Sequence, residues 1–249
     1  EEIANHIALL REKSVHITKA ARSATVANIL APLLCIPAFK DEVSLSNLTL
    51  WLVYMGVVVV IRTWIVFKLP YEPEKIHDPQ RDLTWITYAV GMVGFGWGLG
   101  WVLMAPELQI VNQMIYVYMT TAAMIAGMFA YSVNKPTFFA FTLPIMVPSL
   151  STVLWSTQSF PWPFLVGLAT LYLVVLSIAK NFSGTFENSV RLRFRNERLY
   201  QELAAERDQS VAANVAKSKF IAVASHDLRQ PMHAVNVYLE LINLEGMQE

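Results

Sequence analysis

Cysteine and charged residues are scarce in this sequence. Of 249 residues one is cysteine, Cys35, and 15% are charged, with 19 basic and 19 acidic side chains. A single cysteine excludes a disulfide framework within the chain and a zinc site built from cysteines. A formal net charge of zero provides no overall attraction for nucleic acid, so we expect no nucleic-acid partner.

The charged residues that are present lie mainly near the two ends. Residues 1–22 contain 7 of the 38, residues 23–180 contain 14, and the last 69 residues contain 17. Hydrophobic residues make up 55% of the chain, and the mean hydropathy is +0.41. This composition excludes a disordered chain and argues against an ordinary soluble domain. We expect an all-α protein whose middle is a polytopic membrane bundle.

Long uncharged stretches indicate the number of spans. Residues 43–61 and 136–179 carry no charge, and residues 83–134 carry only Glu107. A helix needs about 20 apolar residues to cross a bilayer. Turn residues and short polar breaks divide the region into six segments of about this length. The predicted spans are 22–39, 46–67, 83–105, 112–133, 136–156 and 162–181.

Basic residues in alternate connections orient these spans. They gather before the first span, around the second and fourth connections, and after the sixth span, at Arg11, Lys13, Lys19 and Arg22; Arg62, Lys68, Lys75 and Arg81; Lys135; and Lys180, Arg191, Arg193 and Arg195. Short cytoplasmic loops collect Lys and Arg, so the pattern favours six spans with both termini cytoplasmic. Five spans would put one basic end outside.

The predicted membrane region offers few groups for ion transport. Arg62 lies about one turn from the end of its span, from where its guanidinium can reach the headgroups. We therefore expect no ionisable side chain at mid-membrane, which argues against a proton pump or ion transporter. The bundle is better suited to receive a small apolar ligand or to act as a bare anchor. We predict no metal site.

Glycine and proline mark two spans where a ligand could enter. Gly94 and Gly98 have the four-residue spacing that lets helix backbones approach closely, and Pro144 and Pro148 are expected to kink the span 136–156. Packing within one bundle explains them most simply, while a dimer interface or a ligand slot remains open. The candidate pocket residues are Trp97, Gly94, Gly98, Pro144 and Pro148.

The chain divides into four predicted segments. Ile3, Ile7 and Leu10 form a helical stripe near the N-terminus, which predicts an amphipathic helix at the cytoplasmic membrane face. The membrane bundle follows, and then a helix with a seven-residue repeat. The expected boundaries are 1–19 for the amphipathic helix, 20–182 for the six-helix transmembrane domain, 183–217 for the helix with the seven-residue repeat and 218–249 for the last segment.

The seven-residue repeat has a weak apolar seam. Its two series are Leu192, Leu199, Glu206, Ala213 and Phe220, and Asn196, Leu203, Ser210, Lys217 and Ala224. Polar residues interrupt both series, so a permanent coiled coil is not expected. The pattern predicts a dimeric helix of marginal stability, able to hold two packings a few kcal/mol apart. A solvated helical linker is the alternative.

The segment from residue 217 carries a specific motif. It reads Lys-Ser-Lys-Phe-Ile-Ala-Val-Ala-Ser-His-Asp-Leu-Arg-Gln-Pro-Met-His, with the central histidine at His226 and the proline at Pro231. Residues 225–231 resemble the H-box of bacterial membrane-bound sensor histidine kinases, in which an acid follows the histidine and a proline lies five residues later. The resemblance covers about 35 residues and follows membrane spans and a heptad helix, the usual order in that family. It implies that 20–182 form a transmembrane sensor domain, 183–217 a signalling helix, and 218–249 the first part of a helical dimerisation and histidine-phosphotransfer domain.

The resemblance implies a role for each residue of the motif. His226 would be the phosphoacceptor, attacking the γ-phosphorus of ATP, and Asp227 its acid/base partner on the other ring nitrogen. Gln230 stands where the family often has Thr or Asn, so its part in positioning water for phosphatase activity is open. Pro231 should bend the helix just after the histidine. His77 and His233 are read as solvated residues.

The resemblance also implies partners and a location. A homodimer in the bacterial inner membrane would pass phosphate to a response regulator or to a fused receiver domain, as in hybrid kinases. Family members that sense diffusible fatty-acid signals have similar multi-span inputs, so a fatty acid or another small apolar signal is expected.

The residues up to Glu249 contain no glycine-rich ATP lid and no P-loop. We therefore expect the chain to be a truncated protein-histidine kinase that binds no cofactor itself, with ATP and Mg²⁺ bound by a catalytic domain beyond residue 249. The alternative function is a non-enzymatic membrane receptor or a transporter with a cytoplasmic helical oligomerisation tail.

Overall fold

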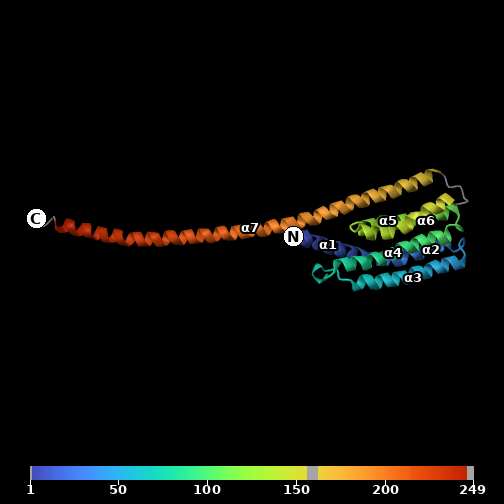
Figure 1. The fold of residues 1–249 in the computed structure, drawn as a ribbon, viewed down its shortest axis with the longest axis horizontal. Coiled ribbons are helices and arrows are strands. Elements are labelled where there is room, and N and C mark those ends of the chain that lie inside the picture. Colours follow the sequence, from blue (N-terminus) through green and yellow to red (C-terminus); the bar gives the residue numbers. More distant parts are fainter. Residues whose placement is uncertain (1, 156–161, 246–249) are drawn as a thin grey trace. The chain divides into compact units, whose positions relative to one another are not determined.

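The described part of the chain is all helical. A computed structural model (Figure 1) describes residues 2–155 and 162–245, with side chains for residues 5–151, 162 and 164–237. No strand occurs among these residues. The elements are α1 (Glu2–Ser23), α2 (Thr25–Phe39), α3 (Leu45–Lys68), the 3₁₀ turn η1 (Pro73–Lys75), α4 (Pro79–Met104), α5 (Ile110–Tyr131), α6 (Lys135–Trp155) and α7 (Trp162–Glu245).

These bounds follow the predicted spans closely from the second span onward. The predicted segments 46–67, 83–105 and 112–133 correspond to α3, α4 and α5, each within a few residues at both ends. Segment 136–156 matches α6 up to residue 155, and residues 156–161 lie outside the described residues. Segment 162–181 is the start of α7, which is unbroken to Glu245.

The length and composition of the helices are those of a membrane protein. Four helices are long and apolar enough to cross a bilayer: α3, α4, α5 and the apolar part of α7. A fifth span arises if α1 and α2, which meet at an angle of 43°, are taken as one broken helix. At 15 residues α2 is itself short, since a span requires about 20 residues. The count of six stays a prediction.

The chain forms two compact units, Glu1–Arg191 and Leu192–Glu249. Within the first unit α4 is the central helix, because it packs against α1, α3 and α6. Helices α2 and α5 complete the packing through contacts with α3 and α6, and α1 also contacts α3 and α5. The second unit consists of the α7 segment beyond residue 191.

Glycines on two faces of α4 permit this packing. A Cβ added at Gly94 would collide with the carbonyl of Phe141, and one at Gly98 with the carbonyl of Pro144. The backbones of α4 and α6 are thus in direct contact, as four-residue glycine spacing allows. On another face, a Cβ at Gly100 would meet the rings of Tyr116 and Trp51.

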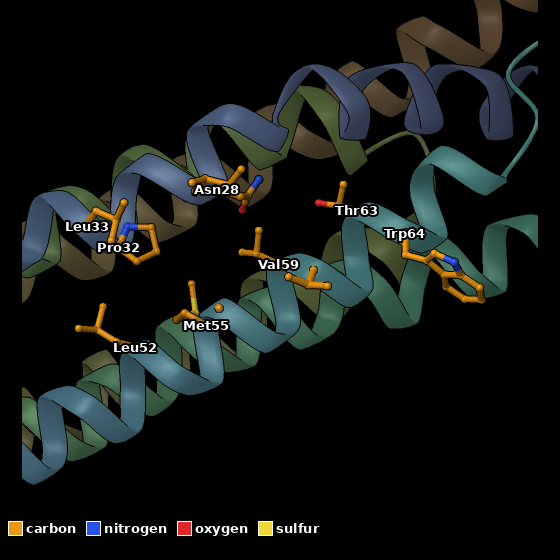
Figure 2. Close-up of a pocket in the computed structure, with 11 residues that line it drawn as sticks. Asn28, Pro32, Leu33, Leu52, Met55, Val59, Thr63 and Trp64 are labelled. Atoms are coloured by element: carbon orange, nitrogen blue, oxygen red, sulfur yellow. The ribbon is translucent and has the colours of Figure 1, made fainter.

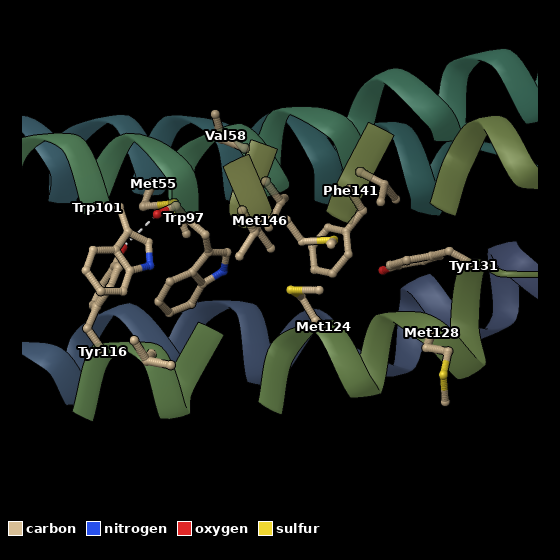
Figure 3. Packing of buried hydrophobic residues seen from close by; sticks show 14 of the residues in the cluster. Met55, Val58, Trp97, Trp101, Tyr116, Met124, Met128, Tyr131, Phe141 and Met146 are labelled. Carbon is tan, nitrogen blue, oxygen red and sulfur yellow. Dashed lines mark hydrogen bonds between the residues drawn. The ribbon is translucent and has the colours of Figure 1, made fainter. Parts of the chain in front are cut away.

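An aromatic cluster fills the core beside α4. Trp51, Trp97, Trp101 and Tyr116 are all at most 2% exposed, and the ring centroid of Tyr116 lies 5.2–6.2 Å from those of the three tryptophans. Figure 3 shows Trp97 and Trp101 beside Tyr116. Trp51 Nε1 donates to the carbonyl of Gly96 at 2.8 Å, and the Tyr116 hydroxyl donates to the carbonyl of Trp97 at 2.8 Å. These bonds lock ring positions where water cannot supply partners.

Two glutamates tie the loops at one end of the bundle together. Glu107, in the α4–α5 loop, accepts from the backbone N–H and the hydroxyl of Ser44 and from the Asn47 amide. Glu42, in the α2–α3 loop, accepts from the Gln109 N–H at 2.8 Å and the Asn112 amide at 2.7 Å. Each loop therefore supplies the carboxylate that caps the helix starting in the other, α3 or α5.

Substituting Gly98 tests the direct α4–α6 contact. We expect Gly98→Ala to lower the free energy of unfolding by about 2 kcal/mol or more, because overpacking a tight contact costs about 1–3 kcal/mol. The measurement is thermal or denaturant unfolding of the purified protein in detergent. The matched control is Gly167→Ala in α7, where the added Cβ meets nothing within 4 Å. Equal effects of the two substitutions would contradict the close approach.

The Glu107 cap predicts a dependence of stability on pH. The N–H of Ser44, helped by the Ser44 hydroxyl and the Asn47 amide, lowers the pKa of Glu107 from its ordinary 4.5. The stabilisation is therefore complete above that ordinary value and is lost as the pH falls through the lowered pKa of the folded state.

The unfolding free energies of wild type and Glu107→Gln should accordingly differ at pH 7 and converge at acid pH. Glu206→Gln, in the second unit, is the control and should leave the unfolding of the first unit unchanged. A gap between wild type and Glu107→Gln that persists below the lowered pKa would rule out the cap.

Candidate functional site

The predicted phosphoacceptor histidine lies on an exposed stretch of α7. The side chains of His226 and Asp227 are 68% and 70% exposed, and His226 Nδ1 lies 3.5 Å from Asp227 Oδ1. A carboxylate beside Nδ1 favours the tautomer that carries its proton there, which leaves Nε2 with a lone pair. The arrangement can therefore present a nucleophilic nitrogen to solvent.

The other two residues of the motif are also on α7. Gln230 lies one turn after His226 and is exposed, as is Pro231. The helix continues through Pro231 to Glu245, so this proline does not end it. The bend expected at Pro231 stays a prediction. Residues 246–249 of the predicted last segment lie outside the described residues.

Apolar side chains are exposed along the second unit. Leu192 is 58% exposed, Leu203 59% and Phe220 73%, and all three belong to the seven-residue repeat. The charged side chains pair within the helix, Arg193 with Glu197 at 3.5 Å and Arg198 with Glu202 at 2.9 Å. A helix that exposes an apolar stripe to water generally needs a partner to cover it.

Helix α1 contacts the part of α7 that belongs to the first unit. Lys13 Nζ lies 2.5 Å from Glu187 Oε1, with the side chains only 13% and 33% exposed. The His16 ring lies 5.0 Å from that of Phe186 and 6.5 Å from that of Phe182. The sequence did not reveal this contact, since α1 was expected at the membrane face. That location stays a prediction, but Ser14, Ile17, Thr18 and Ala21 are fully buried in the bundle.

A buried arginine bridges the break between α1 and α2. Arg62 of α3 is 1% exposed, donates to the carbonyl of Ala21 at 2.5 Å, and lies 3.3 Å from the hydroxyl of Thr25. The expectation that Arg62 reaches the headgroups is wrong. The reason is the helix break, which frees backbone carbonyls that must find donors inside an apolar bundle.

The five candidate pocket residues lie together, but in close contact with one another. Gly94 and Gly98 face the α6 backbone, and a Cβ at Gly98 would lie 3.3 Å from Pro148 Cγ as well as against Pro144. Trp97 is 2% exposed and its ring lies 5.8 Å from that of Trp51. The α4–α6 contact is thus filled by protein atoms, and a ligand role for these residues stays a prediction.

A cavity of about 680 Å³ lies elsewhere, between α2 and α3 (Figure 2). None of the five candidate residues lines it. Its walls are apolar apart from Asn28 and Thr63; the lining residues are Asn28, Ile29, Pro32, Leu33, Leu52, Met55, Gly56, Val59, Val60, Thr63 and Trp64. On α3 they recur every three or four residues, a single helix face that the uniform hydrophobicity of the span conceals in the sequence. Pockets of small-molecule sites commonly measure about 300–1,000 Å³.

Metal ligands are not gathered anywhere in the described ranges. There, no group of three or more His, Cys, Asp or Glu side chains is arranged to hold a metal ion.

Comparison with known proteins gives one partial likeness. The chain is 37% identical over 51 residues to the sensor protein EvgS of Escherichia coli O157:H7. The match covers 20% of this chain and 4% of that protein. No protein-family model matches, and no solved structure matches. The likeness and the apolar helices together indicate a membrane signalling protein.

Reversing charges tests the contact between α1 and α7. Lys13→Glu and Glu187→Lys should each lower the free energy of unfolding, and the double variant should recover about 1 kcal/mol, since the pair is partly shielded from water. The measurement is a double-mutant cycle of unfolding in detergent. The control cycle uses Arg198 and Glu202, exposed on one helix, where a coupling of about 0.3–0.5 kcal/mol is expected. Zero coupling for Lys13 and Glu187 would contradict the contact.

Proposed function

We propose that this chain is the sensor and phosphoacceptor part of a membrane-bound two-component histidine kinase. The bundle senses a membrane-soluble apolar signal and controls ATP-dependent phosphorylation of His226. The single observation that carries the proposal is the H-box-like motif, with His226 exposed beside Asp227 on a helix that begins in the membrane bundle at Trp162 and is unbroken beyond the motif. The partial likeness to a protein named as a sensor supports it.

Phosphoryl transfer assigns a task to each exposed group. His226 Nε2 attacks the γ-phosphorus of ATP, the bond to the β-phosphate oxygen breaks, and ADP leaves. Asp227 holds the other ring nitrogen and stabilises the positive charge that develops on the imidazole. The phosphoryl group then passes to an aspartate of a response regulator or fused receiver domain. Gln230, one turn on, is proposed to position water when that aspartyl phosphate is hydrolysed. ATP and Mg²⁺ would be held by a catalytic domain outside this chain.

The packing of α1 supports a route for the signal. Arg62 of α3 holds the α1–α2 break through Ala21 and Thr25. Near its middle, α1 contacts α7 through Lys13 and Glu187. A change in the distance between α2 and α3 would therefore be transmitted to α7 through α1, in a bundle where a small shift repacks whole helices rather than bending them.

The exposed apolar stripe of the second unit supports a homodimer. Leu192, Leu203 and Phe220 would be covered by the same residues of a second copy, in a parallel pair with a weak seam. A weak seam leaves two packings close in free energy, so a modest signal can shift the balance between them. We propose the bacterial inner membrane as the location, with both termini cytoplasmic.

Phosphorylation of the intact parent protein tests the proposal. With γ-labelled ATP we expect acid-labile, alkali-stable labelling that His226→Gln abolishes, because His226 is the one histidine in residues 225–231, the stretch that resembles the H-box. His233→Gln is the matched control, an exposed histidine two turns further along the same helix, and should keep full labelling. Asp227→Asn should slow labelling by at least about tenfold, within the usual contribution of acid–base assistance.

Labelling that persists in His226→Gln would refute the phosphoacceptor. Absence of any labelling in the intact parent protein would favour the non-enzymatic receptor.

A further inference from the structure

The predicted span 162–181, at the start of α7, is covered by the bundle on one side. In the apolar part of α7 22% of the residues are buried, whereas the figure for α3, α4 and α5 is 33–56%. Leu168, Tyr172 and Val175 form the covered side and are 2–4% exposed, and the Tyr172 hydroxyl lies 2.6 Å from that of Ser149 on α6. The opposite side of the helix is open to the bilayer or to another protein.

Polar side chains lie on this open side. Thr170, Ser177 and Asn181 are exposed, and none of the three forms a side-chain hydrogen bond within the described part of the chain. With Val174 and Gly184, which are also exposed, they recur every three or four residues and so share one face of a helix. We call these five residues the polar stripe.

The other spans place their polar side chains differently. Beyond the first two turns of α3, α4, α5 and α6, each described serine, threonine, asparagine and glutamine is buried or half-buried. The side chains that these helices expose are mainly apolar, such as Val57, Phe95 and Leu143. A hydroxyl or amide that faces hydrocarbon without a partner costs free energy. The polar stripe is therefore typical of a helix face that another helix covers.

The sequence continues the polar stripe into the seven-residue repeat. Steps of three or four residues lead from Gly184 through Asn188 to Leu192, and Leu199 and Leu203 follow seven and eleven residues later. These three leucines are 45–59% exposed. Small and polar residues favour contact between helices in lipid, whereas apolar residues favour it in water. The residues at this spacing thus change from polar to apolar where the predicted span ends.

We propose that the polar stripe of α7 is a contact surface within the membrane for the polar stripe of a second copy of this chain. In a parallel pair with two-fold symmetry each residue of the stripe lies near its own counterpart. The Asn181 amide both donates and accepts, as do the hydroxyls of Thr170 and Ser177, so each group can bond to its counterpart. At Gly184 an added Cβ meets nothing within 4 Å, which leaves room for a partner helix.

The pattern of the helix selects a second copy over another partner. A helix that covers α7 has to be polar beside residues 170–184 and apolar beside residues 192–203, and a parallel copy of α7 meets both requirements at the same height. No charged residue lies on the polar stripe to repel its counterpart. Gly94 and Gly98, the alternative place for a dimer interface, are already in contact with the α6 backbone.

The choice of a second copy rests on the homodimer of the proposed function. The polar stripe itself belongs to the first unit, and its contact is measured without ATP. The membrane contact, the seam of the second unit and the kinase can therefore fail separately.

Cysteine cross-linking of the purified chain in dilute phosphatidylcholine vesicles tests the surface. Single cysteines are placed at Thr170 and Val174 and, as matched controls, at the adjacent exposed residues Ala169 and Leu173, about 100° around the helix. After oxidation we expect at least about fivefold more disulfide-linked dimer from Thr170→Cys and Val174→Cys than from the controls, because a disulfide requires Cα atoms within about 7 Å. Wild type is the blank, since its one cysteine, Cys35, is buried.

Random collisions would give a different order, because Leu173 is 67% exposed and Val174 45%. Equal cross-linking at the four positions, or none above the blank, would overturn the proposal. Leu203→Cys separates the two contacts. Cross-linking there but not at Thr170 and Val174 would leave the homodimer and refute the membrane contact, and the reverse result would uphold the membrane contact and refute the seam of the second unit.

The hydrogen bonds are tested by association in the same vesicles, followed as energy transfer between donor-labelled and acceptor-labelled copies on dilution with lipid. Asn181→Leu should weaken association about threefold to tenfold, the range of hydrogen bonds between helices in membranes. Asn181→Gln keeps the amide and should stay within about twofold of wild type, as should the control Ala169→Leu off the stripe. Association of Asn181→Leu as strong as that of wild type would refute the hydrogen-bonded contact.

Discussion

Backbone contact between α4 and α6 is the constraint on which the bundle depends. Helices in a membrane gain nothing from hiding apolar side chains from apolar lipid, so they associate through close packing and hydrogen bonds. Gly94 and Gly98 supply the close packing, because their missing side chains let the carbonyls of Phe141 and Pro144 approach α4 directly. With α6 seated there, the remaining faces of α4 can hold α1 and α3.

The polar groups inside the bundle follow from the same absence of water. Trp51 and Tyr116 donate to α4 carbonyls, and Arg62 donates to the end of α1. A buried cation is expensive to keep, and one without its acceptor more so. The carbonyl freed at the α1–α2 break therefore needs Arg62 as its donor. Any movement of α3 relative to α1 must either keep or break the hydrogen bond from Arg62 to Ala21.

Within the first unit the helices are thus packed closely along α4 and less closely beside α2. Gly56 faces open space while Gly98 has none, which places the cavity on the side of the bundle that can change without disturbing the α4–α6 contact. A change in the spacing of α2 and α3 would act on Arg62 and hence on α1, whose middle contacts α7 through Lys13 and Glu187. Sensing and stability would then use different helices, which is what a sensor of modest binding energy requires.

Several features of this protein could be predicted from the amino-acid sequence alone. Five of the predicted segments match helices, because a run of some twenty uncharged residues bounded by polar turns can form little else in a membrane. The glycine spacing in α4 indicated close packing, since such spacing is a local pattern. The role of the motif around His226 stays a prediction. The first span was the poorest match, as the residues 22–39 hold a break at Ala24 and a helix of 15 residues.

Other features arose only when the helices came together. Nothing along the chain pairs Arg62 with Ala21, Lys13 with Glu187, or Glu107 with Ser44, because these partners lie 41, 174 and 63 residues apart. The same holds for the cavity, whose α3 wall is drawn from a span that is apolar on every side. The spacing of apolar residues along a helix reveals its buried face only where the opposite face is polar. In lipid the outward-facing side chains are apolar too, so this spacing does not distinguish the two faces. Tertiary packing therefore decided which glycines contact a neighbouring helix, which face open space, and where a ligand can lie.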